Sequence, residues 1–129
     1  MIDHIVLNVR DLAKSKRFYA EALAPLGYRV VKEFPGAVGF GTGARGDMWL
    51  WRRDPASANT HLAFVCGTRS LVDAFHAAAL KGGGRDHGAP GLRTDYHPDY
   101  YGAFALDPDG NNVEAVCHEP SIATGPARS

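Results

Sequence analysis

One carboxylate lies where an ordinary protein core would not accept it. Glu114 falls inside an apolar run, between Val113 and Ala115, where an ionised group is costly unless it is paired or bound to a metal. Two histidines, His4 and His61, fall in apolar, strand-like runs of their own. Two imidazoles and one carboxylate form a donor set used by divalent-metal sites that keep positions open for substrate. The sequence therefore suggests a metal site at His4, His61 and Glu114, with a metal-free polar cleft as the alternative.

Glu114 belongs to the second strand of an expected β-hairpin. The strands are expected over residues 101–106 and 112–117, joined by Asp107-Pro108-Asp109-Gly110-Asn111. This segment has turn chemistry, because Pro presets φ, Gly accepts a positive φ, and Asp side chains bond nearby amides. Asp107 and Asp109 are therefore interpreted as turn formers rather than as metal ligands.

Apolar periodicity and capping residues indicate the other elements. Strands are expected over residues 2–9, 28–34, 37–41, 47–52 and 60–66. One helix is expected to begin at Leu12, capped by Asp11, and a second to run from a capping box at Ser70 through Lys81. A polar, flexible segment is expected over 85–98 and a loose tail over 119–129.

Length, charge and hydropathy exclude several functional classes. A chain of 129 residues is expected to form one domain. Its 14 basic and 14 acidic residues form no basic stripe, which argues against nucleic-acid binding. No apolar run reaches the roughly 18 residues of a membrane span. The N-terminus has no basic leader followed by an apolar stretch, so a cytoplasmic location is expected.

The two halves of the chain resemble each other. A shift of 57 residues places His4 on His61, and residues 3–27 then share six identities with residues 60–84. A shift of 64 continues the match and places Phe40 on Phe104. The chain is interpreted as a βαβββ unit written twice, with modules at about 1–54 and 60–118 and a shared cleft. Chance similarity between two amphipathic strand–helix pairs is the alternative.

These motifs resemble those of the vicinal oxygen chelate superfamily, which includes glyoxalase I, type I extradiol dioxygenases, fosfomycin-resistance enzymes and bleomycin-binding proteins. The resemblance covers residues 2 to about 118. Its carriers are His4 in Asp-His-Ile-Val-Leu-Asn-Val, His61 in Thr-His-Leu-Ala-Phe-Val, and the Asp-Pro-Asp-Gly-Asn turn followed by Glu114. It implies an α+β, glyoxalase-like fold in which two tandem βαβββ modules form a curved mixed-sheet cup. It also implies that His4, His61 and Glu114 hold a divalent metal (Fe, Mn, Ni or Zn), and that the protein is a homodimer.

The sequence departs from the glyoxalase I pattern at one position. The 64-residue shift places Leu50 opposite Glu114, and leucine can neither ligate a metal nor accept a proton. Because glyoxalase I draws on paired glutamates, this particular activity is disfavoured. The remaining two histidines and one glutamate resemble the triad of extradiol dioxygenases, although those enzymes usually carry two double modules and this chain has one.

Strand alternation suggests further residues of the cup. The residues expected to face inward are Val6, Asn8, Met48, Arg52, Ala63 and Asn112. Of these, Asn8, Met48, Arg52 and Asn112 are expected to bind the substrate. Arg52 would hold an anionic group, or would be a solvated charge at a strand end. Glu114, His97 and Tyr101 are candidate catalytic acid–base groups, and the adjacent Tyr100 could also supply such a group. Packing is the alternative for the two tyrosines. Trp49 and Trp51 are expected under the helices.

Two functions remain open at this point. In the first, the metal acts as a Lewis acid, or activates oxygen, on a small substrate that chelates through neighbouring oxygens. The enzyme would be of the lyase/isomerase or extradiol dioxygenase type. In the second, the cup sequesters a drug or metabolite without a metal, as in bleomycin-resistance proteins.

Overall fold

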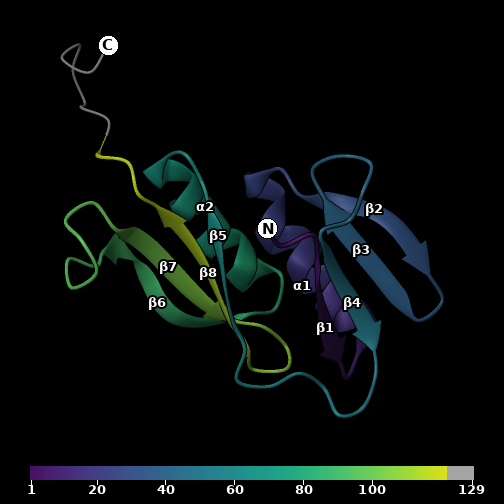
Figure 1. Ribbon diagram of the computed structural model, residues 1–129. Helices are drawn as coiled ribbons and strands as arrows, with labels where there is room; N and C mark the ends of the chain where they lie inside the picture. Colours follow the sequence, from purple (N-terminus) through teal and green to yellow (C-terminus); the bar gives the residue numbers. More distant parts are fainter. Residues whose placement is uncertain (122–129) are drawn as a thin grey trace.

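The computed structural model describes residues 1–121 and contains two four-stranded sheets, each with one α-helix (Figure 1). The N-terminal module consists of β1 (Ile5–Val9), α1 (Leu12–Leu23), the short 3-10 helix η1 (Ala24–Leu26), β2 (Arg29–Phe34), β3 (Ala37–Gly41) and β4 (Met48–Arg52). The C-terminal module consists of β5 (His61–Val65), α2 (Arg69–Lys81), β6 (Arg85–Leu92), β7 (Tyr101–Leu106) and β8 (Asn112–Cys117). The tandem βαβββ order predicted from the sequence is therefore confirmed. The expected tail lies outside the described residues from 122 onward.

Both sheets are mixed and have the same topology. Their strand orders are β1-β4-β3-β2 and β5-β8-β7-β6, with the β1–β4 and β5–β8 pairs parallel and the other pairs antiparallel. In residues 1–121 no strand pairing joins β1 to β5, so each module keeps its own sheet. No helix in this range is long and apolar enough to cross a membrane.

The two helices pack against each other, and each also packs against its own sheet. Figure 1 shows them in the middle of the view, with the C-terminal sheet on the left and the N-terminal sheet on the right. The core combines side chains from both helices and from the helix-facing side of each sheet, among them Leu7, Phe18, Leu50, Phe75 and Val113. Burial of this apolar surface stabilises the fold. Within residues 1–121, no helix packs on the opposite face of either sheet, which is called the open face below.

Segment 85–98 differs from the expectation. Its first part forms the edge strand β6, paired with β7, instead of a flexible link. This strand is difficult to predict from the sequence, because its glycines and Pro90 have low β-propensity. The structure accommodates Pro90 because an edge strand tolerates proline. The ladder is irregular at Gly88 and Gly91, where the register shifts.

The first expected helix cap is confirmed and the second is wrong. The Asp11 side chain accepts a bond from the Lys14 amide at 3.0 Å, as predicted. The N-cap of helix α2 lies two residues earlier than expected, at Thr68 instead of Ser70, because the Thr68 hydroxyl accepts the Leu71 amide at 3.3 Å.

The register of the sheets corrects the comparison between the modules. Val6 is paired with Trp49 in the first module, and the equivalent Ala63 is paired with Glu114 in the second. The structural equivalent of Glu114 is therefore Trp49, a shift of 65 residues (114 − 49), and the predicted Leu50 equivalence is wrong. Leu50 is fully buried on the helix side, since a slip of one residue moves a side chain to the other face of a strand.

Candidate functional site

Glu114 lies on the open face of β8 with both carboxylate oxygens bonded. Its neighbours Val113 and Ala115 point into the core, and Glu114 itself is only 1% exposed. Oε1 lies 2.8 Å from Nε2 of His61, and Oε2 accepts a hydrogen bond from the hydroxyl of Tyr100. The cost of burying this carboxylate is thus offset by two partners on neighbouring segments.

The surroundings of Glu114 favour a protonated Tyr100 and leave one side of His61 open. Burial, followed by the hydrogen bond to and the charge of Glu114, raises the pKa of the Tyr100 hydroxyl, which therefore remains a donor. A side chain at Gly102 would place its Cβ 3.2 Å from Glu114 Oε2, so the glycine leaves room for this contact. The His61 side chain is about half exposed, and its ring lies edge-on to Phe104 with centroids 6.1 Å apart.

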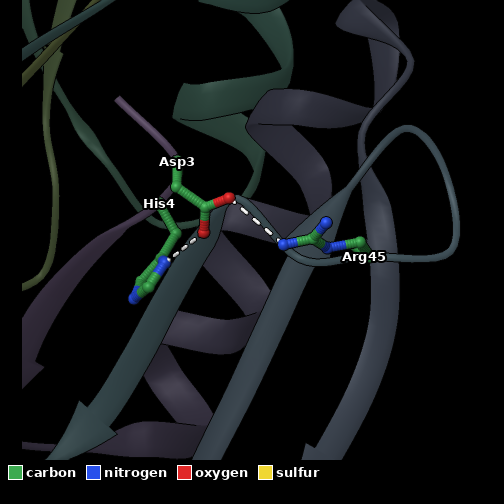
Figure 2. Close-up of polar contacts among 3 residues, drawn as sticks. All are labelled: Asp3, His4 and Arg45. Carbon is green, nitrogen blue, oxygen red and sulfur yellow. Dashed lines mark hydrogen bonds and ion pairs between the residues drawn. The ribbon is translucent and has the colours of Figure 1, made fainter. Parts of the chain in front are cut away.

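His4 points to different partners. It directly precedes β1, and its Nδ1 lies 2.6 Å from Oδ2 of Asp3, whose Oδ1 in turn accepts from Arg45 at 3.2 Å. Figure 2 shows this chain of contacts from His4 through Asp3 to Arg45. The hydrogen bond from His4 and then the charge of Arg45 lower the pKa of Asp3.

The three expected metal ligands are not brought together in the chain. His61 and Glu114 are in direct contact. Within residues 1–121, however, no three side chains of His, Cys, Asp or Glu lie close enough to hold one ion. Both oxygens of Glu114 are also engaged by protein partners. As placed within one chain, these residues do not fit a three-ligand metal site.

His4 lines a different feature, an apolar hollow on the N-terminal sheet. This aromatic recess, with a volume of about 330 Å³, is bounded by His4, Val6, Phe34, Trp49 and Trp51. The expectation that both tryptophans lie under the helices is wrong. Their strand neighbours Met48 and Leu50 face the core, so alternation along β4 turns the tryptophans to the open face.

Trp49 is held in place by its neighbours. Its ring stacks on Phe34 with centroids 6.0 Å apart and an interplanar angle of 20°. A Cβ at Gly39 would lie 2.8 Å from this ring, and one at Gly46 would lie 3.1 Å from it. Glycine at these two positions therefore lets the indole lie flat on the sheet.

Two cations lie beside the recess. The Arg53 guanidinium is 3.9 Å from the centre of the Trp51 ring, and the Lys32 ammonium is 5.5 Å from the centre of Phe34. Trp51 remains 37% exposed and Phe34 52% exposed. The recess thus offers aromatic faces for stacking and positive charges beside them.

The four expected substrate-binding residues have different environments. Met48 is 1% exposed and is part of the core, so this expectation is wrong. Arg52 forms an ion pair with Asp54 at 3.1 Å. This environment resembles the alternative expectation, a solvated charge at a strand end. The Asn8 backbone exchanges hydrogen bonds with Ser57. Asn112 is opposite His61 in the ladder, and its buried Oδ1 has no partner within residues 1–121.

Of the expected catalytic groups, Tyr101 faces away from Glu114. Its hydroxyl donates to Asp73 of α2 at 2.7 Å. The tyrosine that reaches Glu114 is Tyr100, which the sequence analysis named beside Tyr101 without separating the two. Strand alternation could have identified Tyr100. Side chains two residues apart lie on the same face of a strand, so Phe104, Gly102 and Tyr100 share one face.

His97 lies behind Tyr100 and does not contact Glu114 directly. Its Nδ1 accepts from the Asp99 amide at 3.1 Å, so its Nε2 carries the proton donated to Nδ1 of His118 at 2.8 Å. The rings of His97 and His118 both pack edge-on against Tyr100, with centroids 5.4 Å away. The pair therefore positions Tyr100.

The comparisons with known proteins define the class. The family model described as Glyoxalase/Bleomycin resistance protein/Dioxygenase superfamily matches residues 1–115. The chain belongs to this superfamily, as the motifs around His4, His61 and Glu114 suggested. Among curated proteins, none matches the chain.

Solved structures agree with this assignment. A glyoxalase/bleomycin resistance protein from Albidiferax ferrireducens T118 is 30% identical, with a TM-score of 0.76 over 89% of this chain and 96% of that one. A glyoxalase/bleomycin resistance protein/dioxygenase family enzyme from Burkholderia phytofirmans PsJN is 20% identical, with a TM-score of 0.72 over 92% and 98% of the two chains. A glyoxalase-related enzyme from Fulvimarina pelagi is 18% identical, with a TM-score of 0.68 over 91% and 87%. The last two likenesses concern the fold alone.

Proposed function

We propose that the protein binds a small planar organic molecule in the aromatic recess and does so without a metal. The observation that carries this proposal is the hollow of about 330 Å³ walled by Phe34, Trp49 and Trp51. Largely apolar hollows of this size are typical of small-molecule sites. The role would be sequestration of a drug or metabolite, consistent with the bleomycin-resistance members named in the family description.

The chemistry of the walls narrows the ligand class. Each stacked aromatic pair contributes about 0.5–1.5 kcal/mol beyond area burial. The guanidinium beside Trp51 and the ammonium beside Phe34 favour a ligand with an anionic or electron-rich oxygen group next to its ring. We therefore expect planar aromatic anions to bind better than neutral molecules of the same shape.

The two tryptophans provide a direct test. Trp49 and Trp51 are the only tryptophans of the sequence, so intrinsic fluorescence reports on the recess. Titration with 8-anilinonaphthalene-1-sulfonate and with simple aromatic carboxylates should give saturable quenching that EDTA does not change. By calorimetry, Trp51→Ala should weaken binding about tenfold. The matched control Tyr96→Ala, at an exposed ring outside the recess, should not. Unsaturable quenching, or an effect equal in both variants, would overturn the proposal.

A metal-dependent enzyme is the second candidate. The observation that favours it is the direct contact of His61 Nε2 with Glu114 Oε1 at 2.8 Å, two donor types of a metal-ligand set on adjacent strands. His4 would have to move, or another chain would have to supply a donor, to complete the set. Since the residues do not fit such a site within one chain, no reaction step is derived through a metal. Glyoxalase I activity stays disfavoured, now because Trp49 occupies the position equivalent to Glu114.

Elemental analysis separates the two candidates. The protein should be purified without added metal or chelator and compared with the Glu114→Gln and His61→Ala variants. Absence of stoichiometric Fe, Mn, Ni or Zn, together with retained ligand binding in His61→Ala, supports the binding protein. Near-stoichiometric metal that falls sharply in both variants would support the enzyme instead, and substrate screening of catechols and α-hydroxycarbonyls would follow.

Assembly and location complete the proposal. We propose a homodimer, because β1 and β5 are edge strands with one unpaired side each. We also propose a cytoplasmic location, which fits two cysteines that form no disulfide.

A further inference from the structure

A second hollow lies away from the open faces, where α1 meets the end of α2. Its volume is about 390 Å³, and its lining includes Lys14, Arg17, Gly82, Gly83, Arg85 and Asp107. These residues come from α1, from the turn between α2 and β6, from the first residue of β6, and from the β7–β8 turn. We call it the basic pocket.

The lining of the basic pocket has an excess of positive charge. Three cations, Lys14, Arg17 and Arg85, face one carboxylate, Asp107, which leaves a net charge of +2. Within residues 1–121, the side chains of Lys14 and Arg85 form no ion pair or hydrogen bond. Like charges that converge on a hollow create a positive potential that attracts anions.

The single carboxylate is already satisfied by other partners. Asp107 is buried, and its Oδ2 accepts from the Tyr19 hydroxyl at 2.5 Å and from the Asn111 side-chain amide at 3.3 Å. Its Oδ1 accepts from the backbone amides of Asp109 and Asn111, each at 2.9 Å. With its lone pairs so occupied, Asp107 fixes the turn and, within residues 1–121, forms no ion pair with any of the three cations.

The backbone keeps the hollow open and orients one cation. The Arg17 side chain donates through Nη2 to the carbonyl of Lys81 at 3.1 Å, which uses one of its five donors. Gly83 has a φ of +102°, which disfavours any side chain, and a Cβ there would lie 3.9 Å from Arg17 Nη1. The positive φ, rather than a lack of space, is therefore what favours glycine beside this guanidinium.

From this combination we propose that the basic pocket binds a small dianion of the phosphate monoester class. Arg17 offers its remaining donors to phosphate oxygens, and Lys14 and Arg85 add charge from the other two sides. The net charge of +2 matches a phosphate monoester, which is dianionic above a pKa of about 6. The hollow is larger than a phosphate group alone needs, which leaves room for the organic part of the ester. This site is separate from the aromatic recess and does not depend on the function proposed there.

Calorimetry in a phosphate-free buffer at pH 8 tests the proposal. The probes are glycerol 3-phosphate, inorganic phosphate and, as the uncharged control, glycerol. We expect one molecule of glycerol 3-phosphate per chain, with affinity that falls as NaCl is raised. Arg85→Gln and Lys14→Gln should each weaken binding about tenfold. Arg29→Gln, an exposed cation on β2 outside the pocket, should have no effect. If inorganic phosphate binds as tightly as the ester, the pocket serves free phosphate; weaker binding of inorganic phosphate identifies the ester.

Thermal melts give a second readout that does not depend on a folding defect. Because the side chains of Lys14 and Arg85 have no partner in the part of the chain that the structure describes, Arg85→Gln and Lys14→Gln should leave the stability of the free protein unchanged or slightly raised. Glycerol 3-phosphate should then raise the Tm of the wild-type protein and of Arg29→Gln by more than it raises the Tm of the two pocket variants at the same ligand concentration. Binding that is equally strong in the pocket variants, that glycerol reproduces, or that has no defined stoichiometry would overturn the proposal.

Discussion

At the scale of single residues, the carboxylate of Glu114 is held in place by its two partners. It is buried between two donors from different segments, the imidazole of His61 and the hydroxyl of Tyr100. A buried acceptor that loses its donor costs more than the average hydrogen bond contributes, because the desolvated atom stays unpaired.

Tyr100→Phe tests this arrangement without changing the shape of the ring. The variant leaves Glu114 Oε2 buried without its donor, and we expect a loss of about 1–3 kcal/mol in the free energy of unfolding, measured in urea. Tyr96→Phe is the matched control, because this neighbouring ring is 66% exposed and its hydroxyl has no partner within residues 1–121. Equal and small losses in both variants would show that the Tyr100 hydroxyl does not pair with Glu114.

Cys66 gives a pH-dependent prediction. Burial, and to a smaller extent the nearby Cys117, raises the pKa of the Cys66 thiol from 9.0 to about 11. Only the thiolate reacts quickly with iodoacetamide. The rate of Cys66 labelling in the native protein should therefore keep rising up to about pH 11, whereas in urea it should level off near pH 9, as read by mass spectrometry. Because the folded pKa is the higher one, the stability that this thiol contributes is complete below pH 9 and is lost as pH rises toward 11. Rapid labelling of the native protein at pH 8 would contradict this.

At the scale of elements, the N-terminal sheet is shaped around one indole. Strands β3 and β4 are neighbours in this sheet, and Gly39 of β3 is the direct ladder partner of Trp49 of β4. The indole of Trp49 lies over this glycine. The recess depends on this close approach, because any side chain at position 39 would lift the ring from the sheet.

Gly39→Ala should disturb the recess selectively. Its Cβ would lie 2.8 Å from the Trp49 ring, so the indole must move. We expect a loss of about 1–3 kcal/mol in unfolding free energy, a shifted tryptophan emission spectrum, and weaker ligand quenching. Gly36→Ala is the control in the preceding turn, where a Cβ meets nothing within 4 Å. An unchanged spectrum in Gly39→Ala would show that Trp49 does not lie on β3.

The same elements show how far the sequence could predict the structure. Asp107 to Asn111 and the cap at Asp11 were predictable, because both depend on local chemistry. Strand β6 was not predictable from the sequence. Its glycines and proline have low strand propensity, and its conformation depends on pairing with β7. The predicted equivalence of Glu114 and Leu50 was wrong by one residue. An alignment of two weakly similar sequences does not show how their strands are paired in the sheet. That single slip also misplaced the tryptophans, as the faces of a strand alternate.

At the scale of the whole molecule, the two helices lie between the modules and leave the open faces of both sheets without helical cover (Figure 1). Large apolar side chains are exposed there, including Phe34 and Trp51 on the N-terminal sheet and Val65, which is 72% exposed, on β5. Large exposed apolar side chains next to unpaired strand edges are typical of surfaces that are covered by a partner.

The proposed homodimer makes this argument testable. Light scattering after size exclusion should give about 28 kDa, twice the 13.9 kDa of one chain. Val65→Lys should shift the equilibrium toward the monomer, because a charge on the exposed β5 edge opposes pairing with another chain. Leu80→Lys is the matched control, since this leucine is also exposed but lies on α2. If both variants remain dimeric, β5 is not part of the interface. A wild-type mass near 14 kDa at high protein concentration would instead show that each open face works alone, with the aromatic recess complete within a single chain.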